Sequence, residues 1–168
     1  KRNSADELAK SFAQVDVCLL LISDMAVEPF LAEHTFLRAK PCVHFSGSLV
    51  TPMAWGAHPL NTFPHGRYNL DVYQKTYFVC EKSDFQFSQI FPDLPNPVAY
   101  IEKEKKALYH ALCSVTGNFT SLLWQRGFQD FESKLGIGRE PLIPFLETIA
   151  ANLIQNPEHA VTGPLVRK

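Results

Sequence analysis

A lysine and a histidine four residues apart are the first candidates for chemistry in this sequence. Lys106 and His110 would lie on one face of a helix, about 6 Å apart along its axis. A lysine can polarise a carbonyl group or accept a proton, and a histidine can donate a proton near neutral pH. Because Lys106 would also suit an ordinary solvated helix face, the spacing alone leaves both interpretations open.

Polar and small residues continue this helical face toward the C-terminus. Asn118 follows Lys106 by twelve residues, about 18 Å along a helix axis, so the two cannot act on the same atom. We therefore expect Ser114 and Asn118 to bind another part of a substrate. Close packing against a second helix is the alternative for the small residues on this face, which are Ser114, Gly117 and Ser121.

Two further histidines lie in the first half of the chain. His44 stands between Val43 and Phe45, a setting typical of a buried, hydrogen-bonded histidine, with substrate binding as the alternative. His58 precedes Pro59, and here a catalytic acid–base role and a structural role fit about equally well. We take His58 as a third catalytic candidate and His44 as a substrate-binding candidate.

Short polar turns follow two apolar runs. Ser23 and Asp24 follow the first run, and Ser46 and Gly47 follow the second. Doubly wound sheets bind ligands at the carboxyl ends of their strands, and a glycine there lets the backbone approach a ligand closely. These four residues are candidate cofactor-binding residues, although serine, aspartate and glycine also favour ordinary turns.

The N-terminal part of the chain alternates between helical and strand patterns. Residues 4–7 match a capping box, which predicts a helix to about Phe12. The run 15–22 is almost continuously apolar, as in a strand buried on both faces of a parallel sheet. A helix opening near Pro29 and a strand over 41–45 complete the pattern. This order predicts a parallel α/β sheet.

A proline-rich segment separates this part from the rest. Residues 54–64 and 75–81 read as further strands, and 91–97 contains three prolines. We therefore predict a nucleotide-binding domain over 1–97 and a second domain over 98–168.

The second domain has a helical period. Apolar residues recur at helical spacing from 101 to 135, and 141–155 is apolar around most of its circumference. The second segment should be buried between neighbouring helices or in a homodimer interface. Thr162 is typical of a cap that begins a third helix.

The composition excludes several classes of function. The chain has 168 residues and a net charge of −1, without the basic excess that nucleic acid or an anionic membrane would require. No apolar run approaches the roughly 20 residues of a membrane span, and no signal peptide is evident, so we expect a cytoplasmic protein. The histidines and cysteines show no metal-ligand spacing, so no metal site is expected.

Several short motifs taken together carry a family resemblance. They lie at 43–47, 57–64, 106–110, 117–118 and 162–164. The sequence resembles a bacterial family of unknown function that has a Rossmann-like domain followed by a helical C-terminal domain and is labelled as predicted dehydrogenases. More distantly, the architecture is similar to pyrroline-5-carboxylate reductase, ketopantoate reductase and deazaflavin-dependent NADP reductases. The resemblance implies a helical domain like the C-terminal domain of 6-phosphogluconate dehydrogenase.

The sequence departs from this family at its ends. The family begins with a strand and a G-x-G-x-x-G turn that binds pyrophosphate, and neither is found here, so we expect a chain truncated at both ends relative to the family. Residues 1–4 resemble the end of the second Rossmann strand. Arg2 and Ser4 would there suit the 2′-phosphate of NADP, unless they are only a solvated terminus and a helix cap.

The resemblance favours one function and leaves a second open. The fold class is α/β, an incomplete Rossmann parallel sheet followed by an all-helical domain. The first hypothesis is an NADP-dependent oxidoreductase acting on a small carbonyl or imine substrate, in a cleft with Lys106 and His110 on one wall. The second is a non-catalytic protein of the same fold that senses a dinucleotide or acts as a dimeric interaction module.

Overall fold

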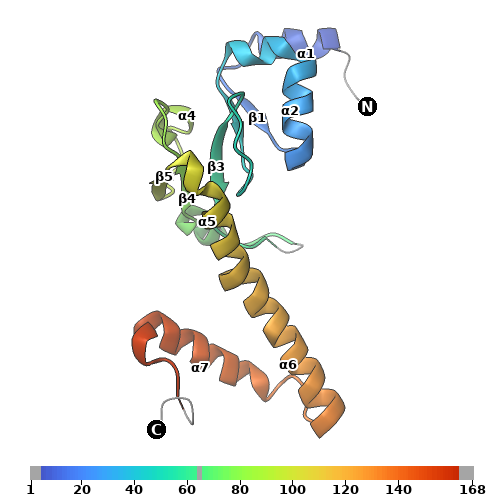
Figure 1. Ribbon diagram of the computed structural model, residues 1–168, viewed down its shortest axis with the longest axis vertical. Coiled ribbons are helices and arrows are strands. Elements are labelled where there is room, and N and C mark those ends of the chain that lie inside the picture. Colours follow the sequence, from blue (N-terminus) through green and yellow to red (C-terminus); the bar gives the residue numbers. More distant parts are fainter. Residues whose placement is uncertain (1–4, 64–65, 163–168) are drawn as a thin grey trace. The chain divides into compact units, whose positions relative to one another are not determined.

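The computed structural model describes residues 5–63 and 66–162 of the chain. The chain divides into two compact units, Lys1–Val115 and Thr116–Lys168. The first unit contains a five-stranded sheet with short helices, and the second contains the longest helices (Figure 1). This confirms the expected α/β fold followed by a helical region.

The sheet of the first unit follows the order of the strands in the chain. Its strands are β1 (Cys18–Leu20), β2 (Cys42–His44), β3 (Trp55–Pro59), β4 (Phe78–Glu81) and β5 (Val98–Ile101). The first three strands are parallel, β4 runs antiparallel to β3, and β5 is parallel to β4. The expected parallel sheet is therefore confirmed as a mixed sheet in which parallel pairs predominate.

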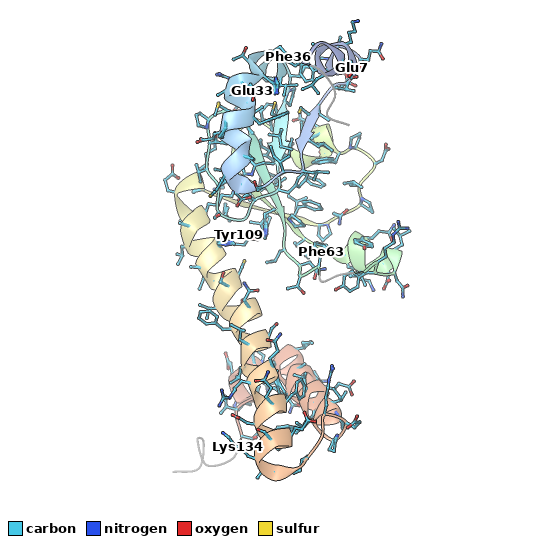
Figure 2. All side chains as sticks on the ribbon, turned by 90° about the vertical axis from the view of Figure 1, so that its right-hand side faces the viewer. Glu7, Glu33, Phe36, Phe63, Tyr109 and Lys134 are labelled. Atoms are coloured by element: carbon cyan, nitrogen blue, oxygen red, sulfur yellow. The ribbon has the colours of Figure 1, made fainter. Side chains whose placement is uncertain are left out.

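Helices cover one face of the sheet. They are α1 (Ala5–Phe12), α2 (Asp24–Glu33) and a 3₁₀ turn over Thr35–Ala39. Their apolar side chains form a core with the first strands, made of Phe12, Leu20, Val27, Leu31, Leu37, Cys42 and Ala54. Phe36 packs edge-on against Phe12 beside α1 (Figure 2). The predicted helix to Phe12 is confirmed, whereas α2 begins at Asp24, before the expected start near Pro29.

A second core lies on the opposite face. It contains Val43, Trp55, Ala57, Cys80 and Phe87. Since successive residues of a strand face opposite sides, Cys42 contributes to the first core and Val43 to the second. The short helices α3 (Leu70–Lys75) and α4 (Phe87–Ile90) were not predicted, because neither is long enough to show a helical period.

The expectation that residues 15–22 are buried on both faces is wrong. β1 is an edge strand of the described sheet and pairs only with β2. Leu20 is 4% exposed, but Leu19 is 44% and Leu21 is 79% exposed. The strand expected over 54–64 ends at Pro59, because the Asn61 N–H donates to the Pro59 carbonyl in a tight turn.

The long helix expected over 101–135 is divided into shorter elements. β5 ends at Ile101, and the helical part consists of a 3₁₀ turn (Lys103–Lys105), α5 (Lys106–Cys113), a π-helical turn (Ser114–Asn118) and α6 (Phe119–Leu135). A π turn widens the helix, so one helical wheel no longer describes the faces on both of its sides. β5 and α5 belong to the first compact unit, and the domain boundary expected near residue 98 stays a prediction.

The second unit contains α6 and α7 (Leu142–Gln155), followed by a 3₁₀ turn over Pro157–His159. Gly136, with φ of 66°, ends α6, and the Gly136 N–H donates to the Glu132 carbonyl. Trp124 contacts Phe145 edge-on at 6.0 Å between ring centroids. None of the described helices is long and apolar enough to cross a membrane. Thr162 ends the described segment, so the expected third helix lies outside the described residues.

Candidate functional site

The loop that follows β2 joins the helix that follows β1. The Ser46 hydroxyl lies 2.5 Å from the Asp24 carboxylate at the start of α2. The Ser46 oxygen also accepts hydrogen bonds from the backbone N–H groups of Ser48 and Leu49, at 3.1 and 2.9 Å. These bonds define a Ser46–Leu49 loop at the carboxyl edge of the parallel strands, where doubly wound sheets bind ligands.

Two histidines converge on Gly47 within this loop. A Cβ atom at Gly47 would lie 2.7 Å from His110 Nδ1 and 3.1 Å from His58 Nε2. His58 comes from β3 and His110 from α5. Because any other residue at this position would displace an imidazole, the absence of a side chain at Gly47 is what allows both rings to approach the loop.

Tyr109 fixes the orientation of His58. Its hydroxyl lies 2.7 Å from His58 Nδ1, and the two rings meet edge-on. Since Nδ1 is engaged by the phenol, Nε2 is the nitrogen that faces Gly47. If Nδ1 donates to the phenol oxygen, Nε2 presents a lone pair, and if the phenol donates, Nε2 carries the proton.

The surroundings favour the neutral forms of both groups. Burial, the neighbouring His110 and the Lys106 charge lower the pKa of His58 below its usual range. Burial and a hydrogen bond with Cys113 raise the pKa of Tyr109. His58 is therefore a neutral imidazole at pH 7, able to accept a proton, and Tyr109 is a neutral phenol.

Lys106 is buried beneath this loop. Its Nζ lies 2.5 Å from Glu81 Oε1 and donates to the Leu49 carbonyl at 2.6 Å. Both residues are 1% exposed. Burial lowers the pKa of Lys106, and Glu81 opposes this shift. Lys106 is thus paired with Glu81 and presents no surface for a ligand.

His44 lies beside this ion pair and is also 1% exposed. Its Nδ1 accepts a hydrogen bond from the Ser46 N–H at 3.3 Å, so the proton of the neutral ring belongs on Nε2, which is 3.8 Å from Glu81 Oε1. Burial and the Lys106 charge lower the pKa of His44 to about 4. In the described part of the chain, His44 Nε2 and Glu81 Oε2 are buried without a hydrogen-bond partner.

The depressed pKa of His44 predicts a pH-dependent stability. An unfolded histidine takes up its proton near pH 6.5, whereas His44 in the folded chain does so at about 4. Between these values the unfolded state binds more protons, so stability is retained above pH 6.5 and lost as the pH falls toward 4. We expect His44 to contribute a loss of about 2–3 kcal/mol between pH 7 and pH 4.5.

Urea unfolding at several pH values measures this loss. His44→Gln should flatten the dependence, whereas His159→Gln, which alters an exposed histidine, should leave it unchanged. Equal slopes for the His44 variant and the wild type would show that His44 is not the group responsible.

The structure brings together some of the predicted site residues and separates others. Asp24, Ser46, Gly47, His58 and His110 gather at the carboxyl edge, and Ser23 is the N-cap residue of α2. His44 and Lys106, which were predicted to touch substrate, lie buried below them. Ser114 caps α5, and Asn118 belongs to the second compact unit. Arg2 and Ser4 lie outside the described residues.

Sequence reasoning missed Glu81 and Tyr109. Glu81 ends the apolar strand Phe-Val-Cys-Glu, where the only signal is a carboxylate at the end of a run that should be buried. Tyr109 adjoins His110, but adjacency in a helix gives no sign that its hydroxyl reaches β3. Within residues 5–63 and 66–162, no three histidine, cysteine or acidic side chains are grouped to hold a metal ion.

Two solved structures have similar folds. The provisionally named NADP oxidoreductase BF3122 from Bacteroides fragilis superposes with a TM-score of 0.73 and 18% identity, over 99% of this chain and 73% of its own. Protein TM1727 from Thermotoga maritima gives a TM-score of 0.70 and 19% identity, over 98% of this chain and 74% of its own. At these identities the similarity establishes the fold. No functionally curated protein matches the chain.

A family model also matches the sequence. It describes a domain of unknown function, DUF2520, and covers residues 81–168. This region begins at Glu81 and includes Lys106, Tyr109 and His110. The match covers more than half of the 168 residues of the chain, and the chain therefore belongs to the DUF2520 family.

Proposed function

We propose that this chain is part of a cytoplasmic NADP-dependent oxidoreductase that acts on a small carbonyl or imine substrate. The observation that carries the proposal is the convergence of His58 Nε2 and His110 Nδ1 on Gly47, at the carboxyl end of β2. The fold shared with a provisionally named NADP oxidoreductase supports the choice of cofactor class.

The described residues of the carboxyl edge fit a dinucleotide. Asp24 is exposed next to Ser23, and the Gly47 backbone has no side chain in front of it. Carboxylate and hydroxyl groups at this edge suit ribose hydroxyls, and glycine permits close approach. In this proposal Ser23, Asp24, Ser46 and Gly47 would hold the cofactor, and Arg2 and Ser4 would select its 2′-phosphate.

The histidine pair suits the proton transfer of such a reaction. Reduction of a carbonyl group requires a hydride at carbon, which a bound reduced nicotinamide supplies, and a proton at oxygen. Two neighbouring imidazoles disfavour simultaneous protonation, so one can hold the proton while the other stays neutral. His58 and His110 are then the catalytic residues, and Ser114, at the end of α5 in the same unit, binds a more distant part of the substrate.

Calorimetry of the gene product that contains this chain tests the proposal. We expect NADPH to bind at micromolar concentrations and NADH to bind at least tenfold more weakly, because Arg2 would pair with the 2′-phosphate. Arg2→Ala should remove this preference, while His159→Ala should leave both affinities unchanged. Absence of binding by either dinucleotide would overturn the proposed function, and a preference for NADH would overturn only the role of Arg2.

One observation favours the second function, a dimeric interaction protein. Among the described residues of the second unit, Leu142 is the one hydrophobic residue that is buried. Large apolar side chains of α6 and α7 are exposed, namely Phe119, Leu122, Leu123, Leu135, Phe145, Leu153 and Ile154. Two helices that leave this much apolar surface exposed are typical of one half of an interface with a second copy.

Sedimentation measures this association. We expect a dimer at micromolar concentration, and Leu123→Asp together with Ile154→Asp should yield monomers, because each carboxylate would be desolvated in the interface. The matched control is Glu147→Asp, which keeps the charge of α7 and should leave the dimer intact. A wild-type protein that stays monomeric would exclude this second function.

A further inference from the structure

We propose that Glu81 and Lys106 are positioning residues, which hold the Ser46–Leu49 loop so that Gly47 faces His58 and His110. The inference rests on the proposed function only in treating the two histidines as catalytic. The structural part of the inference is that the buried Glu81–Lys106 pair fixes the Ser46–Leu49 loop. This part depends only on contacts within the first unit.

The strand register places the pair in one row across the sheet. His44 is directly opposite Gly56 in β3, and the antiparallel register of β3 with β4 brings Gly56 opposite Glu81. These three residues therefore share one face of the sheet. A Cβ at Gly56 would overlap both Lys106 Nζ and the Glu81 carboxylate, so the ion pair occupies the space above the glycine.

Lys106 links this row to the loop. Its ammonium group lies between the Glu81 carboxylate and the Leu49 carbonyl. The loop is held a second time by Ser46, whose oxygen accepts two N–H groups from the loop itself and whose hydroxyl donates to Asp24. Two attachments on four residues leave little freedom to the intervening Gly47.

A buried ion pair such as Glu81–Lys106 is not expected to add much to the unfolding free energy. A buried ion pair loses the hydration of both charges, and apolar residues of similar size often stabilise a protein equally well. Directed bonds, in contrast, fix atoms in place. Lys106 Nζ bonds a backbone carbonyl two residues from Gly47, so its contribution is to the position of the loop.

The double variant Glu81→Leu/Lys106→Met separates position from stability, because it removes both charges and keeps apolar volume. We expect the urea concentration at its unfolding midpoint to stay close to that of the wild type. The Ser48 and Leu49 amides, in contrast, should exchange their hydrogens at least tenfold faster, and the NMR signals of the His58 and His110 rings should shift. Both measurements are made without any dinucleotide, so a failure of NADPH to bind would leave this result unaffected.

Phe87→Leu is the matched control, because Phe87 is buried in the second core, on the face of the sheet opposite Glu81 and Lys106. It should destabilise the unit without shifting the histidine signals. The proposal would be overturned if the double variant kept the wild-type exchange rates of the loop amides and the wild-type NMR signals of the two histidine rings. If that variant does not fold, amide hydrogen exchange in the wild-type protein provides the test. Ser48 and Leu49 amides that exchange faster than the amides of Cys80 and Glu81 would also overturn the proposal.

Discussion

Gly56→Ala is expected to lower the unfolding free energy of the first unit by about 3–5 kcal/mol. The new methyl group would overlap Lys106 Nζ and the Glu81 carboxylate, which are held at 2.5 Å from one another. Neither group can move to water, since both residues are 1% exposed. The substitution therefore displaces two buried charged groups from the positions in which they pair, and the weaker pairing in the interior accounts for the expected loss.

Urea unfolding followed by tryptophan fluorescence measures this effect. In a Trp124→Phe background the remaining indole is Trp55, which donates to the Glu81 carbonyl and so reports on the first unit. Gly127→Ala is the control, because no atom lies within 4 Å of a Cβ at Gly127 and alanine is the better helix former. If Gly56→Ala lowers the unfolding free energy by less than about 1 kcal/mol, the Glu81–Lys106 pair does not depend on the absence of a side chain at Gly56.

His58→Gln is expected to lower the rate of substrate reduction by about 10²–10⁴-fold, the usual contribution of a general acid or base. Glutamine keeps a polar group near the Tyr109 hydroxyl but cannot exchange a proton near neutral pH. The affinity for NADPH should change less than threefold, because His58 is assigned to the proton and not to the cofactor.

The rate is measured as NADPH oxidation with any carbonyl or imine compound that the wild-type protein reduces. His159→Gln serves as the control, since this histidine is exposed and belongs to the second unit. A His58→Gln rate within twofold of the wild type would remove His58 from the mechanism. A large loss in both variants would indicate a general defect in folding.

The sequence predicted the elements with a strong local pattern. β2 and α7 match their apolar runs, and α6 ends at Leu135, where the helical period of the sequence ends. β5 was missed because Val-Ala-Tyr-Ile is short and borders a helical pattern, and its strand character depends on pairing with β4. Pairing across a sheet is a tertiary effect that local propensity does not contain.

The candidate site was predicted in part for the same reason. Turn residues at strand ends indicated Asp24, Ser46 and Gly47 as cofactor-binding candidates, which stays a prediction. Ser46 does contact Asp24, because strand ends of a parallel sheet meet at one edge. A helical wheel put Lys106 and His110 on one face, but it could not show that Lys106 extends into the sheet toward Glu81. That contact requires the empty position at Gly56, 50 residues earlier in the chain.

The exposed edge at β1 has a consequence for handling the protein. One side of this strand pairs with β2, and the other side leaves backbone N–H and C=O groups free to pair with an extended peptide. Leu19 and Leu21 are exposed beside it, and no charged residue lies between Val17 and Ser23 to discourage such pairing. A fragment with these bounds should therefore aggregate more readily than a longer chain that supplies a further strand at this edge.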